Sequence, residues 1–173
     1  PPATPTRPSR CPGPRPAIRC GVRSTNGCSD NPGLIPPDSP TPFRHTLRVY
    51  WEDTDAGGVV FYANYLKFFE RARTEWLRAL GFEQTALARD HGVVFVVSSL
   101  AIDYLKPAAF NDELTVTVEL ESLGAAQIVV KQAVERAGQP LAAASVRIGC
   151  VNTATFRPAR IPEPVVTRIG NPA

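Results

Sequence analysis

The sequence predicts an α+β domain in which an antiparallel sheet wraps around one long helix. Two observations support this fold class. Large apolar side chains repeat at helical spacing between residues 64 and 80, and four strand-like segments follow residue 92 without another helix between them. A helix with such a stripe must bury it, and the only large partner available is the sheet.

The first predicted element of this domain is a strand over residues 45–51. Leu47, Val49 and Trp51 alternate with Arg48 and Tyr50, which is the period of a half-buried strand. A loop containing two aspartates and two glycines then leads directly into the helical segment. The loop therefore lies between a strand end and a helix start.

The longest helical signal covers residues 64–80. Its apolar side chains are spaced to form one wide face: Tyr65, Phe68, Phe69, Ala72, Trp76 and Leu80. Asn64 is the expected N-cap and Gly81 the expected C-terminal stop. On the polar face, Arg71 and Glu75 have the i,i+4 spacing of an ion pair.

A short second helix is expected over residues 83–90, ending near Gly92. Strands are then expected at four places in chain order: residues 93–104, 113–121, 127–135 and 141–152. The joins at residues 122–125 and 136–140 are short and rich in turn formers. We therefore expect these strands to be antiparallel neighbours.

Proline content and charge divide the chain. Residues 1–42 hold 12 of the 18 prolines and carry five arginines against two aspartates, a net +3, whereas residues 43–173 carry fourteen basic and fourteen acidic residues. We interpret residues 1–42 as a disordered Pro- and Arg-rich extension. Residues 43–157 form the predicted domain, and residues 158–173 a C-terminal tail in which three prolines interrupt regular structure.

The composition argues against several classes of function. Because the domain is electroneutral, it indicates no basic face for nucleic acid. No segment approaches the roughly 20 apolar residues that span a bilayer, and no secretory leader is visible, so we expect a cytoplasmic protein. Two histidines, and four cysteines without Cys-x-x-Cys spacing, predict neither a metal centre nor a disulfide framework.

The loop before the helix has the residue types of a reaction site. Gly57 and Gly58 allow the backbone to approach a ligand closely. The first turn of the following helix presents unpaired N–H groups at the positive end of its dipole, where an oxyanion is stabilised. Asp53 and Asp55 point to opposite sides of an extended backbone, so at most one faces the site. On spacing alone, both are best interpreted as turn formers.

Three stretches around this loop resemble the hotdog-fold acyl-CoA thioesterases: residues 52–60 (EDTDAGGVV), 63–65 (ANY) and 70–77 (ERARTEWL). The resemblance is to the 4-hydroxybenzoyl-CoA thioesterase group, and within it to the Tol-Pal-associated YbgC branch. It covers roughly residues 44–157. It implies a central helix wrapped by an antiparallel sheet, as the periodicity predicts, and dimers or dimers of dimers with active sites between subunits.

The resemblance also assigns roles to residues. The second acid of the D-x-D motif, Asp55, is the implied catalytic carboxylate, as general base or nucleophile. A backbone N–H near Tyr62 polarises the thioester carbonyl; this sequence has tyrosine, as in the hydroxybenzoyl-CoA enzymes, where YbgC-branch members have histidine. The residues implied to surround the substrate are Gly57, Gly58, Val59 and Asn64. Such chemistry demands neither metal nor cofactor.

Substrate and partner expectations follow from the same resemblance. The substrate is an acyl-CoA, and three basic side chains are candidates to hold the coenzyme A phosphates: Lys106, Arg136 and Arg157. The expected assembly is a homodimer or homotetramer, with acyl carrier protein or envelope machinery as candidate partners. No nucleic acid partner and no membrane span are expected.

Two other functions stay open at this point. One is an interaction subunit that contacts envelope or lipid-synthesis machinery, with hydrolysis secondary. The other is a hotdog hydratase or dehydratase. That chemistry in related folds uses a histidine paired with an acid, whereas neither His45 nor His91 lies in the Asp55 loop.

Overall fold

The computed structural model describes residues 41–170. The elements follow the chain in this order: β1 (Phe43–Arg48), a 3-10 helix η1 (Trp51–Asp53), α1 (Asn64–Ala79), α2 (Gln84–His91), β2 (Val93–Tyr104), β3 (Glu113–Leu123), β4 (Gln127–Arg136), β5 (Gln139–Asn152) and α3 (Glu163–Gly170). The predicted extension falls almost entirely outside the described residues, as do three of the four cysteines. The fourth, Cys150, is buried in β5.

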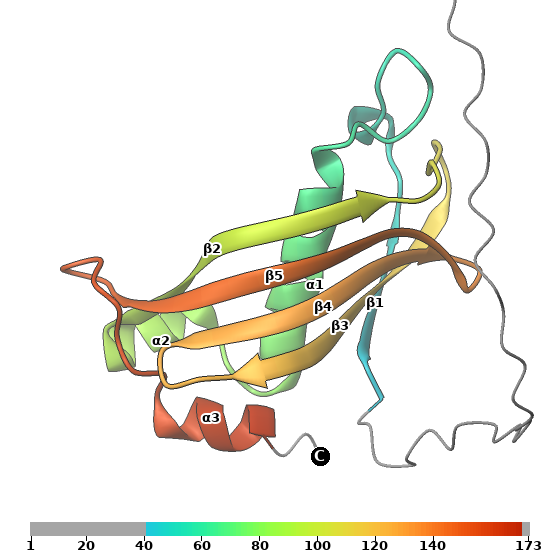
Figure 1. The fold of residues 1–173 in the computed structure, drawn as a ribbon. Coiled ribbons are helices and arrows are strands. Elements are labelled where there is room, and N and C mark those ends of the chain that lie inside the picture. Colours follow the sequence, from blue (N-terminus) through green and yellow to red (C-terminus); the bar gives the residue numbers. More distant parts are fainter. Residues whose placement is uncertain (1–40, 171–173) are drawn as a thin grey trace, which may run out of the picture. The chain divides into compact units, whose positions relative to one another are not determined.

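The five strands form one antiparallel sheet in the order β1-β3-β4-β5-β2. The sheet curves around α1, which lies against its concave face (Figure 1). The predicted fold class is confirmed. The strands joined by short turns are neighbours as expected, whereas β2 pairs with β5 and stands at the edge of the sheet.

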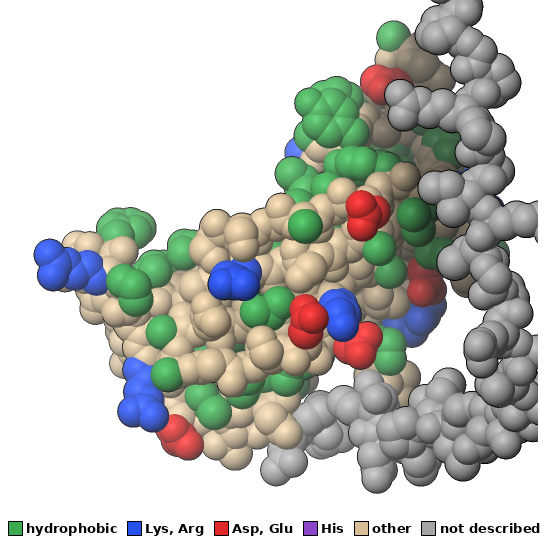
Figure 2. Space-filling view, viewed as in Figure 1, with side chains coloured by type: hydrophobic (Ala, Val, Ile, Leu, Met, Phe, Trp, Pro, Cys, Tyr) green, Lys and Arg blue, Asp and Glu red, His purple; other side chains and the backbone are tan. Residues whose placement is uncertain are grey.

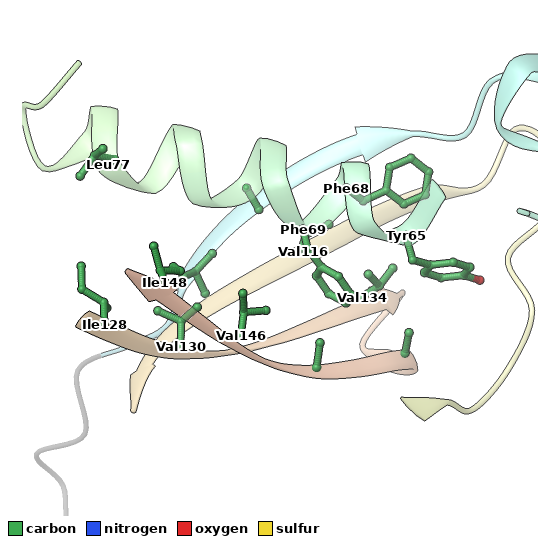
Figure 3. Close-up of a cluster of buried hydrophobic side chains, with 14 of the residues drawn as sticks. Tyr65, Phe68, Phe69, Leu77, Val116, Ile128, Val130, Val134, Val146 and Ile148 are labelled. Atoms are coloured by element: carbon green, nitrogen blue, oxygen red, sulfur yellow. The ribbon is translucent and has the colours of Figure 1, made fainter. Parts of the chain in front are cut away.

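The core lies between α1 and the concave face. Tyr65, Phe68, Phe69 and Ala72 are buried as the helical stripe predicts. Figure 3 shows Phe69 pointing from α1 toward Val134 of the sheet. Farther along, Trp76 and Leu80 are only partly buried and Leu77 is buried instead. The reason is that residues four apart stack in one row on a helix, so the row from Phe69 continues through Arg73 to Leu77.

The ends of α1 differ in part from expectation. Ala63 occupies the N-cap position, and Asn64 is the first helical residue with its side chain turned inward. Gly81 ends the helix as predicted, with φ +91° and its N–H donated to the Arg78 carbonyl at 2.8 Å. Glu75 forms its ion pair with Arg78 rather than with the predicted Arg71.

The first strand is shorter than predicted. β1 ends at Arg48, which pairs with Glu113 of β3, and Trp51 lies in η1 and is 74% exposed. The backbone turns because the carboxylate of Asp53 accepts the N–H of Tyr50 at 2.9 Å, a contact that an extended strand does not permit.

The expectation of an irregular C-terminal segment is wrong for residues 163–170, which form α3. Pro164 lies in the first turn, where a helix has no N–H bond to lose, so it does not break the helix. Val165 and Ile169, one turn apart, are fully buried and pack on the core together with Ile161. The domain thus uses its last segment to complete its core.

Replacing Ile169 with alanine is expected to lower the free energy of unfolding by about 2–5 kcal/mol, because it removes a buried side chain and leaves a cavity. Urea denaturation measures this value. Thr167→Ala, on the exposed side of α3, is the control and should change stability by less than about 0.5 kcal/mol. Equal stability of the two variants would show that α3 is not part of the core.

Candidate active site

The loop between η1 and α1 is a closed, hydrogen-bonded turn. Thr54 and Val60 form an antiparallel bridge, and the N–H of Asp55 donates to the carbonyl of Val59 at 2.9 Å. Gly58 has φ +74°, a conformation that costs a glycine little. The turn therefore holds Asp55 at a defined place in front of α1.

The Asp55 side chain is exposed but oriented. Its Oδ1 accepts the backbone N–H of Gly57 at 2.8 Å, and within residues 41–170 its Oδ2 makes no hydrogen bond. A Cβ added at Gly57 would lie 3.1 Å from Oδ1, closer than ordinary contacts allow. An alanine at Gly57 would therefore shift this carboxylate by a few tenths of an ångström, while Oδ2 remains available to a substrate or water.

Asp53 has the opposite character, as the sequence predicts for a turn residue. It is only 2% exposed, and both its carboxylate and its carbonyl are used internally. The carbonyl accepts the N–H of Phe61 and the side-chain amide of Asn64, each at 2.9 Å. Asn64, predicted as a substrate-loop residue, is buried. We call Asp53 and Asn64 the loop clamp, because they tie the loop to the first turn of α1.

The N-terminus of α1 presents free donors. Within the described range, the N–H groups of Tyr62 and Ala63 have no protein acceptor. The carbonyl of Tyr62 accepts the Tyr104 hydroxyl at 2.9 Å, which fixes the backbone here, while Tyr62 as a residue is 63% exposed. The turn can therefore offer an N–H to an oxyanion without rearranging.

Two tyrosines to which the sequence analysis gave no role at the site, Tyr65 and Tyr104, support this turn. The Tyr65 hydroxyl accepts the N–H of Ala108 at 3.1 Å, and its ring packs edge-on against that of Tyr104, with centroids 5.5 Å apart. Burial raises the pKa of both phenols, so both remain protonated near neutral pH. Only the pairing of β2 with β5 brings Tyr104 to Tyr62, and no sequence pattern reports such a contact.

The three candidates for phosphate binding have different surroundings. Lys106 is exposed just after β2, at the same end of the sheet as the loop. Arg136 is at this end too, but it pairs with Asp112 at 2.6 Å and is not free. Arg157 follows β5 next to the start of β2, so roughly 36 Å of strand separates it from the loop. Within one chain, the structure does not place Arg157 in this site.

Apolar side chains surround the entrance. Figure 2 shows hydrophobic side chains gathered where β2 ends near the loop before α1. Those exposed around this end include Phe61, Tyr62, Tyr104 and Leu105. Close by in the chain, Trp51 and Phe110 form an edge-to-face pair with centroids 4.6 Å apart. A ligand at this loop would meet apolar surface as well as the carboxylate.

Neither a metal cluster nor a membrane helix is found in this part of the chain. Residues 41–170 contain no group of three histidine, cysteine or acidic side chains arranged to hold a metal ion. The same residues contain no helix with the length and apolarity needed to cross a bilayer. The chemical groups that the loop offers are a carboxylate and backbone N–H donors.

The curved sheet around one helix, with an Asp-Ala-Gly-Gly turn before that helix, defines a class of protein. A family model described as the thioesterase-like superfamily matches residues 49–169. The chain belongs to this superfamily, and the resemblance seen in its sequence is confirmed.

Individual relatives specify which thioesterases of this superfamily the chain is similar to. The chain is 45% identical over 123 residues to the acyl-CoA thioesterase YbgC of Haemophilus influenzae, covering 71% of this chain and 90% of that protein. It is 41% identical over 127 residues to the acyl-CoA thioester hydrolase YbgC of Escherichia coli O6:H1, covering 73% and 94%. The structure of a probable thioesterase from Bartonella henselae, 35% identical, superposes with a TM-score of 0.67 and covers 70% of this chain and 100% of that one.

The loop clamp predicts a structural role for Asp53. Asp53→Asn keeps an acceptor for the Tyr50 N–H but weakens that bond, so the free energy of unfolding should fall by about 1 kcal/mol. Urea denaturation measures the loss. Turnover of an acyl-CoA should stay within about tenfold of wild type, since this side chain is buried away from solvent. A larger loss of turnover with full stability would place Asp53 in the chemistry.

Proposed function

We propose that this protein hydrolyses acyl-CoA thioesters to a free acid and coenzyme A, with Asp55 as the catalytic carboxylate. The observation that carries the proposal is the Asp55 side chain, exposed yet steered by the Gly57 N–H, in a chain homologous to YbgC thioesterases. The free N–H groups at the start of α1 supply the second requirement, a donor for the oxyanion.

The reaction follows from these groups. The thioester carbonyl accepts the N–H of Tyr62, which stabilises the negative charge that develops on its oxygen. Acting as general base, Asp55 takes a proton from water while the water oxygen bonds to the carbonyl carbon; the C–S bond then breaks and the thiolate sulfur takes the proton. Acting as nucleophile, Asp55 bonds to the carbonyl carbon itself and the C–S bond breaks, so coenzyme A leaves as a thiolate that takes a proton from water; water then hydrolyses the resulting anhydride to the free acid and the Asp55 carboxylate.

Substrate contacts complete the proposal. The exposed apolar side chains at the entrance suit an acyl group, and we assign Lys106, an exposed cation at this end of the sheet, to a coenzyme A phosphate. Arg136 orders the neighbouring loop through Asp112 instead, whose carboxylate also accepts the N–H of Ala109. Arg157 contributes to this site only if a second chain supplies it. A cytoplasmic location belongs to the proposal as well.

We assign a homodimer or homotetramer to this function. β2 lies at the edge of the sheet, and half of its backbone N–H and C=O groups face away from β5. Val96 and Val97 on this strand are exposed apolar side chains. An edge of this kind is normally covered, and a second copy of the same strand covers it by extending the sheet.

A second function, as an interaction subunit, has one observation in its favour. The Trp51–Phe110 pair is exposed beside the loop, and aromatic side chains of this kind are common in protein interfaces. Acyl carrier protein and envelope machinery are the partners we assign to this possibility. For the hydratase, no observation adds support, because His45 lies within β1 and His91 ends α2.

The catalytic assignment predicts that Asp55→Asn lowers kcat by roughly 10² to 10⁴, because the amide neither accepts the proton nor attacks the carbonyl. Release of free thiol from a panel of acyl-CoAs measures kcat, and melting temperature should barely change. Tyr62→Phe is the control, since it keeps the backbone N–H, and it should cost less than about tenfold. Full activity in Asp55→Asn would remove this residue from the mechanism.

Gly57→Ala tests whether the orientation of the Asp55 carboxylate matters, because it moves the carboxylate without removing its charge. The added Cβ meets Oδ1 at 3.1 Å and pushes the carboxylate aside. A displacement of a few tenths of an ångström should lower kcat by about tenfold, while KM for the acyl-CoA changes less. Unchanged kcat would mean that the orientation of Asp55 does not matter to the reaction.

Light scattering on the full chain measures the mass of the assembly. We expect two or four times the mass of one chain, with activity lost when the assembly dissociates on dilution. A fully active monomer would exclude a site shared between subunits.

A further inference from the structure

A cavity lies between α1, α2 and the strands β2, β4 and β5. Its volume is about 130 Å³, close to the roughly 150 Å³ of a cavity known to bind benzene. Six apolar side chains form most of its wall: Trp76, Leu77, Phe95, Val97, Ile128 and Ile148. Figure 3 shows Leu77 of α1 across the gap from Ile128 and Ile148 of the sheet.

This cavity is separate from the Asp55 loop. Its α1 residues begin at Glu70, whereas the loop joins the start of α1 at Asn64. Arg73, near the middle of the wall on α1, lies about 14 Å along the helix axis from Asn64. None of the loop residues contributes to the wall.

One cation interrupts the apolar wall. Arg73 is partly buried, and its Nη1 donates to Oε1 of Gln132 at 2.8 Å. Gln132 is itself buried and donates its Nε2 to the carbonyl of Phe69 at 3.1 Å, so the guanidinium has a fixed support. No carboxylate of residues 41–170 lies within 4.0 Å of a nitrogen of Arg73.

The guanidinium therefore has unused donors. It carries five N–H groups, and in the described part of the chain one acceptor, Gln132, is bonded to it. Because the side chain is partly buried, desolvation lowers the pKa of Arg73. In residues 41–170 no fully buried side-chain nitrogen or oxygen lacks a partner, so the unpaired nitrogens of Arg73 are accessible, and Arg73 is part of the cavity wall.

The nearest acid does not neutralise this cation. Glu70 lies one turn earlier at the rim of the cavity and is exposed. Its Oε1 accepts the hydroxyl of Thr74 at 2.8 Å. Glu70 thus raises the pKa of Arg73 from a distance without forming an ion pair with it.

We propose that this cavity binds a small carboxylic acid, with its apolar body among the aromatic and aliphatic side chains and its carboxylate on Arg73. A guanidinium binds a carboxylate through two parallel N–H bonds, and burial of the body strengthens that pair. A neutral ligand of the same shape would leave the charge of Arg73 desolvated and unpaired, which is costly. The proposal does not depend on the role of Asp55.

Trp76 lines the cavity and reports its occupancy. The full chain has two tryptophans, so Trp51→Phe leaves Trp76 as the only fluorophore of this type. We expect hexanoate to change Trp76 fluorescence saturably with a Kd of about 1 mM, as suits a ligand of so few atoms. Hexanamide, which has the same size and no charge, should bind about tenfold more weakly.

Variants in this background locate the binding. Arg73→Gln should remove the preference for hexanoate over hexanamide, while Arg71→Gln, an exposed arginine two residues earlier, should leave it unchanged. Val97→Phe keeps Arg73 and fills the cavity, so it should weaken the binding of both hexanoate and hexanamide. If circular dichroism shows that Arg73→Gln is unfolded, Val97→Phe still tests whether the ligand binds in this cavity. Asp55→Asn should bind hexanoate as the parent does, which separates this site from the catalytic one.

Several results would overturn the proposal. They are the absence of saturable binding of hexanoate up to about 20 mM, equal affinity for the acid and the amide, and unchanged selectivity in a folded Arg73→Gln protein. Unaltered binding in Val97→Phe would place the ligand elsewhere and overturn it equally.

Discussion

The burial of one face of α1 against the concave sheet is the interaction on which the rest of this structure depends. Tyr65, Phe68 and Phe69 are buried at this contact, and each fully buried aromatic side chain contributes about 2–3 kcal/mol. An isolated helix of 16 residues is barely stable in water. The packing therefore holds α1 together and also determines where its N-terminus stands, at the end of the sheet where β2 finishes and β3 begins.

Polar contacts fix the loop before α1 on this packed helix. The loop clamp, Asp53 and Asn64, ties the segment before α1 to the first turn of the helix. Tyr104 holds the carbonyl of Tyr62 from the neighbouring strand. With these backbone positions fixed, the turn at Gly57 can present the Asp55 carboxylate to solvent. The buried acid, Asp53, holds the loop in place, and the exposed acid, Asp55, is the one to which we assign the chemistry, although the two are only two residues apart.

The apolar face of α1 also contains a charged side chain, that of Arg73. Arg73 lies in the same row as Phe69 and Leu77, where a leucine would bury more apolar surface. A partly desolvated guanidinium without a carboxylate partner costs stability unless something compensates for it. Gln132 compensates in part, through one hydrogen bond at 2.8 Å. Such a group is easier to understand in a binding site than in a core built for stability alone.

The amino-acid sequence by itself determined the class of fold, the bounds of α1 and β2 within one residue, and the family, because helical and strand periodicity and the residues around Asp55 are local patterns. It also indicated that Asp53 is a turn residue. It did not reveal that β1 ends at Arg48, that α3 forms, or that Arg157 lies far from the loop within one chain. Only the tertiary structure decided these, because each depends on contacts between segments distant in the chain, whose pairing no local period records.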